Sequence, residues 1–538
     1  MTSLTFNESS GAFLLTTDDI DRAESSGMTL SRTTRGPNGE FVYYTSDYNK
    51  EPTFNPYAAV PFWKEADGLA LDKLQSVLKH YNDSWAKDTN FVSIAPADKE
   101  PMMFQNAGVE YAVNRDNTLV GDQMGLGKTI TAILTANTIS ARRVLVLCPA
   151  SIRLNWAREI RAWSVIPKVR TYPILKSSDG VSPCAHYVIC SYDLARNPGI
   201  HAALCQTEWD LLVLDEGHYL KSLDAQRTRA VFGGGTARFK DTWLAAKAKH
   251  VLALTGTPLP NRPRECYTMT RAMDWEAIDF LSYENFMYRY NPSMQFGQHT
   301  KEERGRLPEL QARLRCNIMV RRLKKDVLPQ LPDKVYEMTY IESNGAIKEV
   351  LAKEALIDFD PDVLFDPSFS LDGTPISTLR REMGEAKVPR AIEHLKYLLD
   401  IVEVPKVIVF CHHNSVMDAI IEALQKYGIE QNRGGMTTQA KDEGKLRFIS
   451  GDARIYIIQL DTAEGIDGLQ HASSYTVFVE PAWRPGTNEQ CVDRCHRIGQ
   501  HDNVVAQFLI SEGSFDEKVL HAVIGKAQVT HQVLDARF

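Results

Sequence analysis

The segment DQMGLGKT at residues 122–129 has the residue types that bind the phosphates of a nucleotide. It follows a short apolar run and precedes a helical pattern, which predicts a loop between a strand and a helix. Its glycines let the backbone approach phosphate oxygens, its lysine reaches the β- and γ-phosphates, and its threonine can ligate Mg²⁺. Asp122 stands where the strict pattern has its first glycine. We therefore expect ATP and Mg²⁺ as cofactors, bound by Gly125, Leu126, Gly127, Lys128 and Thr129.

Two further apolar runs end in polar residues that suit the same chemistry. LLVLDEGH ends in two carboxylates: Asp215 would hold Mg²⁺ through water, and Glu216 would orient or deprotonate the attacking water. His218 is expected to couple this pair to the next segment, LALTGTPLPN. There Thr255 and Thr257 would sense the γ-phosphate and link its state to DNA contact. The alternative for that segment is a simple turn.

A third segment, QCVDRCHRIGQ at residues 490–500, supplies arginines far along the chain. Phosphoryl transfer needs positive charge at the γ-phosphate in the transition state. Arg494 and Arg497 are three residues apart, so on a short helix they would share one face. We expect both to act as arginine fingers from a second lobe, with hydrolysis requiring the lobes to close. The predicted catalytic residues are Lys128, Asp215, Glu216, Arg494 and Arg497.

Short apolar runs alternate with helical patterns over most of the chain. NTLVG, RVLVLCP, YVICSY, DLLVLDE and HVLALTG indicate buried parallel strands, and KVIVFCH, ARIYIIQLD, YTVFVEP and VVAQFLI form a second series. The predicted fold class is α/β, with two tandem parallel-sheet lobes, a helical insert, and a small α+β N-terminal module that ends in a helix near 69–85. The expected domains are 1–95 for that module, 96–275 for the first lobe, 276–395 for the insert and linker, and 396–538 for the second lobe.

The net charge of −7 does not by itself suggest a nucleic-acid-binding protein, but the charge is unevenly distributed. Residues 1–100 hold 15 acidic and 9 basic side chains, whereas residues 301–325 hold 3 acidic and 9 basic. A local basic stripe matters more to DNA than the global sum, although a solvated charged face is the alternative. Its place between the lobes favours contacts with the phosphate backbone, through Arg321, Arg322, Lys324 and Lys325.

No apolar run is long enough to span a membrane, and the N-terminal residues lack the pattern of a secretory signal. The nine cysteines are scattered, and several lie beside apolar runs, as is typical of reduced, buried cysteines. No second ligand pair lies at zinc-site spacing from Cys491, Cys495 and His496. We expect a cytoplasmic protein of a bacterial or phage-infected cell, with no zinc and no membrane contact.

Residues from about 95 to 530 resemble the Swi/Snf-type ATPases of helicase superfamily 2. DQMGLGKT and DEGH match the family's nucleotide motifs, and the Q-DR-HRIGQ pattern distinguishes it from RNA helicases of the DEAD type. The resemblance implies two RecA-like lobes, contact of Gln105 with adenine, and a grip on one DNA strand by VLVLCPASIRLNWAREI. It also implies nucleotide contacts by Gln490, Gly465 and Asp467, and DNA contacts by Pro149, Ser151, Arg153 and Thr255.

Two inter-lobe segments, MVRRLKKDVLPQLPDK and STLRREMGEAKVPRAIEHL, resemble the annealing-helicase or HARP-like branch and its short phage and bacterial relatives. One departure is TAEGIDGLQHA, where Glu464 replaces a glycine of the family pattern. The resemblance implies a DNA-dependent ATPase that translocates on double-stranded or forked DNA and remodels or reanneals it. Two alternatives stay open: a displacer of DNA-bound proteins such as polymerase, and a strand-separating helicase. Replication, repair or transcription proteins are the expected protein partners.

Overall fold

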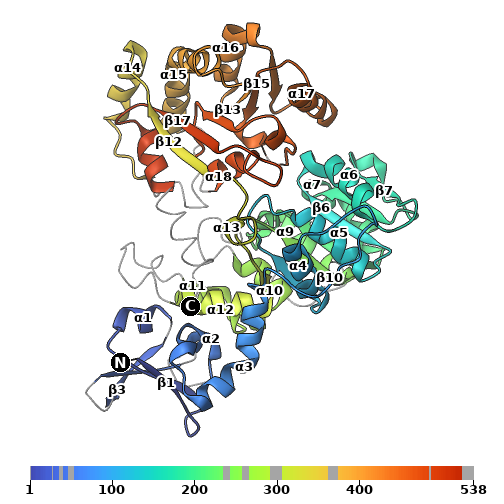
Figure 1. Cartoon of the computed structure of the whole chain (residues 1–538), viewed down its shortest axis with the longest axis vertical. Helices are drawn as coiled ribbons and strands as arrows, with labels where there is room; N and C mark the ends of the chain where they lie inside the picture. The colour runs from blue at the N-terminus through green and yellow to red at the C-terminus, as the bar shows by residue number, and fades with distance from the viewer. Residues whose placement is uncertain are drawn as a thin grey trace. The chain divides into compact units, whose positions relative to one another are not determined.

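The computed structural model describes residues 2–26, 28–35, 40–45, 54–233, 243–256, 266–290, 306–361, 374–463, 465–483 and 486–523. The chain divides into two compact units, and Figure 1 labels their helices and strands. The first unit comprises the residues up to 327 apart from 124–126, and the second begins at residue 328. Among the described residues, no helix is long and apolar enough to cross a membrane.

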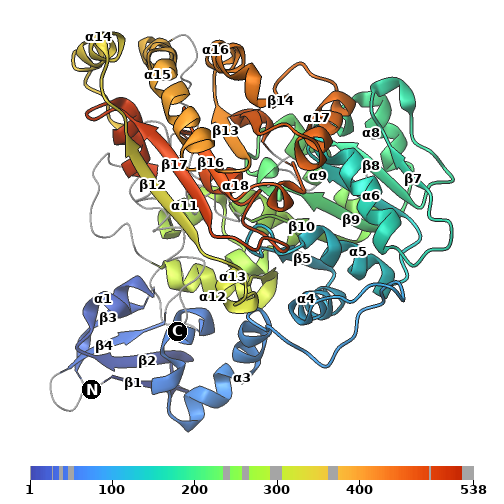
Figure 2. The same cartoon turned by 45° about the horizontal axis from the view of Figure 1, so that its top comes forward.

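The N-terminal residues form a small antiparallel sheet with helices packed on it, which confirms the predicted α+β module (Figure 2). The strands lie in the order β1-β2-β4-β3. Phe13 and Tyr43 of the sheet pack with Phe62 and with Leu74 of the following helix. The elements are β1 (Ser3–Asn7), β2 (Ala12–Thr17), α1 (Ile20–Ser25), β3 (Thr29–Arg35), β4 (Phe41–Tyr44), α2 (Pro56–Ala59), η1 (Val60–Glu65) and α3 (Gly68–Asp83).

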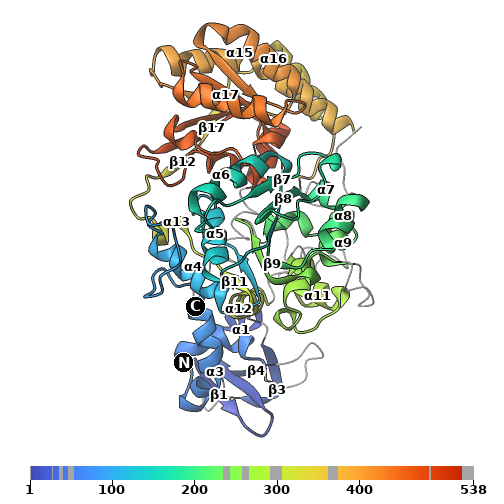
Figure 3. The same ribbon diagram turned by 90° about the vertical axis from the view of Figure 1, so that its right-hand side faces the viewer.

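A seven-stranded parallel sheet forms the centre of the rest of the first unit, in the order β11-β5-β10-β9-β6-β8-β7. Strands β6 and β8 are buried at every residue, which is why their sequences are continuously apolar. Helices α4–α6 cover one face and α7–α9 the other (Figure 3). The bounds are α4 (Met103–Val113), β5 (Asn117–Val120), α5 (Lys128–Thr138), β6 (Val144–Cys148), α6 (Arg153–Trp163), β7 (Thr171–Pro173), β8 (Tyr187–Ser191), α7 (Tyr192–Ala195), α8 (Pro198–Cys205), β9 (Trp209–Asp215), α9 (Gln226–Phe232), β10 (Ala248–Leu254), α10 (Tyr267–Met273), α11 (Tyr283–Tyr290), α12 (Leu307–Asn317), β11 (Met319–Val320) and α13 (Lys324–Val327).

The second unit holds a six-stranded parallel sheet in the order β12-β17-β16-β13-β15-β14. Leu395 and Met417, from α15 and α16, pack on one face of it. Phe448 and Val492, from α17 and α18, belong to the cluster on the other face. The bounds are β12 (Lys334–Tyr340), α14 (Gly345–Glu354), α15 (Pro375–Asp400), β13 (Val407–Cys411), α16 (Asn414–Leu424), β14 (Ile429–Asn432), α17 (Thr438–Ser450), β15 (Ile455–Gln459), β16 (Tyr475–Phe478), α18 (Thr487–Val492) and β17 (Val504–Ile510).

The structure corrects the predicted helical insert at 276–395. Strand β11 pairs with β5 in the first sheet, and β12 pairs with β17 in the second. Residues up to 327 therefore belong to the first unit, and the second sheet begins at β12, well before residue 396. Periodicity missed both strands, because β11 has two residues and β12 is mostly half-buried or exposed.

Candidate nucleotide-binding site

The phosphate loop joins β5 to α5 and turns on two glycines. Gly125 and Gly127 have φ of 82° and 73°, in the left-handed region that residues with a Cβ atom rarely adopt. A Cβ atom at Gly127 would also lie 2.6 Å from Nε2 of Gln105. Helix α5 begins at the next residue, and the first backbone N–H groups of a helix favour anions. The structure thus brings Gln105 to the loop, and it places Thr129, half-buried, at the second residue of α5.

Lys128 is the first residue of α5, and its ammonium group lies close to an acceptor and to acidic groups. Its Nζ atom donates a 2.8 Å hydrogen bond to the backbone carbonyl of Asp122. Burial lowers the pKa of Lys128, while the carboxylates of Glu216, Asp122 and Asp215 act in the opposite direction. Exchanging a neutral carbonyl for a phosphate oxygen would give Lys128 a charge-assisted hydrogen bond, so its position suits phosphate binding.

Asp215 ends β9 and is held by aromatic side chains from two other elements. Nε1 of Trp156 donates 2.7 Å to its carboxylate, and the hydroxyl of Tyr192 donates 2.8 Å to its backbone carbonyl. Burial and the neighbouring Glu216 raise the pKa of Asp215 to about 6, against the lowering effect of Trp156 and Lys128. A divalent cation would stabilise the charged carboxylate, so the Asp215 side chain fits the predicted Mg²⁺.

Glu216 follows in a left-handed conformation, with φ of 51°, which is uncommon for a residue with a side chain. Nδ1 of His218 lies 3.3 Å from Oε2 of Glu216 and 3.3 Å from Oγ1 of Thr255. His218 therefore joins the acidic pair to the end of β10, as the sequence predicted. Thr255 is fully buried, which is inconsistent with the predicted DNA contact by its side chain, and Thr257 lies outside the described residues.

The segment predicted to grip DNA gives a mixed result. Ser151 is exposed just after β6, and Pro149 before it is buried. Arg153 is only 7% exposed, and its guanidinium donates to the backbone carbonyls of Ala150 and Ile174, 2.9 and 2.5 Å away. Its predicted DNA contact is therefore corrected: Arg153 fixes the loop that follows β6. Ser151 stays a predicted DNA contact.

The predicted basic stripe at 301–325 is not a charged surface over residues 306–325, the part that the structure describes. Lys325 is exposed, but the guanidinium of Arg321 donates to the strand that leads into the phosphate loop, and Arg322 pairs with Asp122. Neither a solvated face nor a phosphate track describes such side chains, because a count of charges does not show which arginines have partners inside the fold. The buried basic residues are Arg313, Arg315, Arg321, Arg322 and Lys324.

Arg494 and Arg497 lie in turns and not on a helix, which corrects the prediction that they share a helical face. Helix α18 ends at Val492. Beyond it, the N–H groups of Arg494 and Cys495 donate to carbonyls three residues back, as in tighter turns, and Gly499 has φ of 94°. Spacing alone does not reveal this change of backbone geometry.

Both arginines nevertheless contact the segment that carries two predicted nucleotide ligands. Nη1 of Arg497 donates 2.7 Å to the carboxylate of Asp467, and Nη1 of Arg494 lies 3.5 Å from the carbonyl of Ile466. Burial would raise the pKa of Asp467, but Arg497 outweighs burial and lowers it. Gly465 begins this segment with φ of 74°. The second unit thus holds two arginines against one loop, and their predicted role in catalysis stays a prediction.

The other residues of the Q-DR-HRIGQ pattern mainly hold their own unit together. Nε2 of His496 lies 2.7 Å from the carbonyl of Pro332, and the Gln500 amide donates 3.2 Å to the carbonyl of Ser473. Gln490 is half-buried on α18, and its predicted nucleotide contact stays untested. Trp483, expected to pack in the core, is 3% exposed.

The sequence did not identify Trp156 and Tyr192 as supports of Asp215. Trp156 was placed on a helix after the DNA-gripping segment, with no role at the acidic pair. A signal was present, because a tryptophan in the helix after β6 and a tyrosine directly after β8 both lie beyond the carboxyl ends of strands near β9. Such a position indicates a polar contact for an otherwise apolar side chain.

Comparison with known proteins gives two family matches. The SNF2-related domain matches residues 104–352, and the helicase conserved C-terminal domain matches residues 390–499. A solved structure titled Sulfolobus solfataricus SWI2/SNF2 ATPase core in complex with dsDNA covers 84% of this chain and 95% of its own, with 19% identity and a TM-score of 0.39.

Similar curated proteins include SWI/SNF-related matrix-associated actin-dependent regulator of chromatin subfamily A-like protein 1 of Xenopus tropicalis, 30% identical over 80% of this chain and 44% of that protein. Its Caenorhabditis elegans homolog is 29% identical over 83% and 65%. The human DNA annealing helicase and endonuclease ZRANB3 is 29% identical over 81% and 40%. The chain spans less than two thirds of the length of these relatives. From its two domain matches and these relatives, the chain belongs to the Swi/Snf-type ATPases of helicase superfamily 2 and is most similar there to the annealing-helicase branch.

Proposed function

We propose that this chain hydrolyses ATP and uses the energy to translocate along double-stranded DNA, remodelling or reannealing it. The observation that carries the proposal is the grouping of Lys128, Asp215 and Glu216 at the carboxyl ends of β5 and β9, beside a loop that only glycine can form. The family provides nucleotide use, and relatives named as annealing helicases support the reannealing activity.

Mg²⁺ would be held by Thr129 and Asp215 and would neutralise charge on the phosphates. The chain's own residues do the remaining work. Lys128 exchanges the Asp122 carbonyl for phosphate oxygen, and Gln105 is placed against Gly127 to contact the base. Glu216, tied to Asp215 and His218, orients the attacking water with its carboxylate.

A triplex-displacement assay tests movement on the duplex directly. A labelled third strand is bound to duplex DNA, and its release is followed with ATP, without ATP, and with Lys128→Ala. We expect release only by the wild type with ATP. Lys128→Ala should keep the wild-type melting temperature, because its side chain is only half-buried. A wild type that hydrolyses ATP but leaves the third strand bound would contradict translocation.

Two substrates then separate the remaining activities. On a forked duplex, the proposed function rejoins complementary single strands, whereas a strand-separating helicase releases one of them. A duplex carrying a tightly bound protein tests the displacer alternative. Deleting residues 1–95 is not a clean test of any of these, because Val60 and Tyr81 share a core with Ala312 and Cys316 of α12.

A further inference from the structure

The inference concerns Asp122, which stands at the start of the phosphate loop and rests on the proposed ATP site. Its side chain is fully buried, and an ionised carboxylate in that position needs a partner. Arg322 provides one: its Nε donates 2.7 Å to Oδ1, its Nη2 donates to Oδ2, and its backbone N–H donates 2.9 Å to Oδ1. The contact is therefore a bidentate ion pair with a third hydrogen bond.

Asp122 is engaged from both ends. While its carboxylate is held by Arg322, its backbone carbonyl accepts the hydrogen bond from Lys128. The residues on either side are also joined to the Arg322 segment. The N–H of Gly121 donates 2.8 Å to the carbonyl of Val320, and the N–H of Gln123 donates 3.0 Å to the carbonyl of Arg322. The pairing of β5 with β11 thus continues past the strand ends into the first half of the phosphate loop.

The Arg322 guanidinium also reaches the helix that carries Gln105. A Cβ atom at Gly108 of α4 would lie 2.6 Å from Nη2 of Arg322, so a glycine is needed for this approach. Phe104 lies on the same helix, with its ring centroid 5.9 Å from the Arg322 guanidinium carbon. One buried side chain therefore contacts both the phosphate loop and the helix that places Gln105.

The N-terminal module supports the same segment from behind. The Arg315 guanidinium lies over the Trp85 ring, 3.3 Å from its centroid, and donates 3.0 Å to Oγ of Ser84. It also donates 3.2 Å to the carbonyl of Arg321, whose own N–H donates 3.2 Å to the carbonyl of Ser84. The residues after α3 are therefore bonded to the residue next to Arg322.

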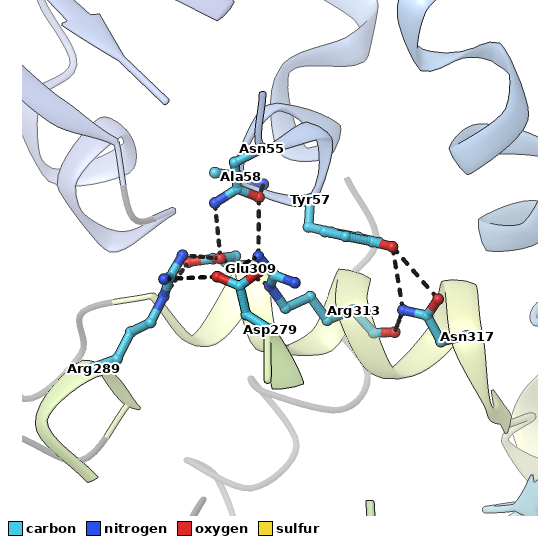
Figure 4. Close-up of polar contacts among 8 residues, drawn as sticks. All are labelled: Asn55, Tyr57, Ala58, Asp279, Arg289, Glu309, Arg313 and Asn317. Atoms are coloured by element: carbon cyan, nitrogen blue, oxygen red, sulfur yellow. Dashed lines mark hydrogen bonds and ion pairs between the residues drawn. The ribbon is translucent and has the colours of Figure 1, made fainter. Parts of the chain in front are cut away.

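A second contact fixes α12 to the same module (Figure 4). Nδ2 of Asn55 donates 3.0 Å to Glu309, and the Arg313 guanidinium lies 3.4 Å from Oδ1 of Asn55. Arg289 also pairs with Glu309, and both partners are buried. Since α12 leads directly into β11, the N-terminal module holds the element from which Arg322 extends.

We propose that Arg322 is a positioning residue for nucleotide binding, acting through Asp122, and that Trp85 of the N-terminal module supports it through Arg315. Asp122 is then an anchor in place of the first glycine of the strict pattern. The N-terminal module is in turn a working part of the nucleotide site, in addition to any contact that it makes with DNA or protein.

The first experiment measures the Kd of a fluorescent ATP analogue and the KM for ATP in full-length Arg322→Lys. Lysine keeps the charge but loses the bidentate fork. We expect Kd and KM to rise about tenfold while kcat changes less than about threefold, because the groups that act on the γ-phosphate are unchanged. Arg142→Gln, an exposed arginine of the same unit, is the control and should bind like the wild type.

The melting temperature separates positioning from a structural role. If Arg322→Lys melts earlier but binds the analogue with the wild-type Kd, the pair only stabilises the fold and the proposal is overturned. Should Arg322→Lys fail to fold, Asp122→Asn replaces it, since an amide of the same shape keeps part of the hydrogen bonding. A wild type that binds the analogue but shows no DNA-stimulated hydrolysis would count against the proposed function and leave this test intact.

Trp85→Leu tests the contribution of the N-terminal module. We expect an increase of about threefold in Kd, because the effect reaches the loop through two intervening arginines. Trp63→Leu is the matched control, since Trp63 packs within the module's own core. An unchanged Kd in Trp85→Leu, or an equal rise in Trp63→Leu, would overturn this second half of the proposal.

Discussion

Each unit holds an arginine against an aspartate, and the two pairs differ in burial. In the first unit the side chains of Arg322 and Asp122 are 1% and 0% exposed. In the second unit those of Arg497 and Asp467 are 14% and 40% exposed. A buried pair is costly to open because each partner would be left without solvation, whereas a partly exposed pair exchanges partners at little cost. The first pair therefore suits a fixed support, and the second suits an arginine that changes contacts during a reaction.

Arg497→Ala should give the largest effect and should affect turnover only. The family resemblance assigns this arginine to stabilising the transferring phosphoryl group, so we expect kcat to fall about 10³-fold. The melting temperature should change by less than about 2 °C, because the ion pair lost is partly exposed. Arg433→Ala, which removes another partly exposed pair in the same unit, should change neither quantity. Full turnover in Arg497→Ala would remove the predicted catalytic role.

Arg322→Ala should do the reverse and lower stability strongly. Leaving the Asp122 carboxylate buried without its partner costs about 3–5 kcal/mol in the free energy of unfolding of the first unit. Denaturant unfolding followed by tryptophan fluorescence measures this. A loss below about 1 kcal/mol would show that the pair is not a fixed support, and the contrast between the units would disappear.

Acid should weaken the first unit through Glu309. Burial would raise the pKa of Glu309, but Arg289 and Arg313 lower it from 4.5 to about 2. Because the folded-state pKa is depressed, the stabilisation is present above pH 4.5 and is lost as the pH falls toward 2. Unfolding free energies across this range should show the decline in the wild type and a flatter profile in Glu309→Gln. Equal slopes in the two proteins would contradict this account.

Lys325→Ala should give the smallest effect, and on DNA alone. Lys325 is exposed, whereas its neighbours Arg322 and Lys324 are buried. Removing one phosphate contact should weaken duplex binding about threefold and reduce the slope of affinity against salt concentration by about one. Fluorescence anisotropy with labelled duplex at several salt concentrations measures both. A change in ATP affinity without a change in DNA affinity would place Lys325 with the buried support instead.

The sequence predicted the strands and motifs that are marked by continuous apolar runs. β6, β9 and β13 were found in this way, and so was the loop ending at Lys128. It did not reveal β12, whose half-buried and exposed residues lack a clear period, or the end of α18 before Arg494. The basic stripe was misinterpreted for a different reason. Charge counts do not show that Asp122 and Glu309 lie beside those arginines, since such pairs join residues far apart in the chain.

The most direct test of the central claim is the ATP hydrolysis rate with no DNA, single-stranded DNA, duplex DNA and forked DNA. Coupling of hydrolysis to movement on the duplex predicts a rate at least about tenfold higher with duplex or forked DNA than without DNA. The stimulation should be absent in Lys128→Ala and should fall as salt concentration rises. Equal rates with and without duplex DNA would contradict the claim that this chain is a double-stranded DNA translocase.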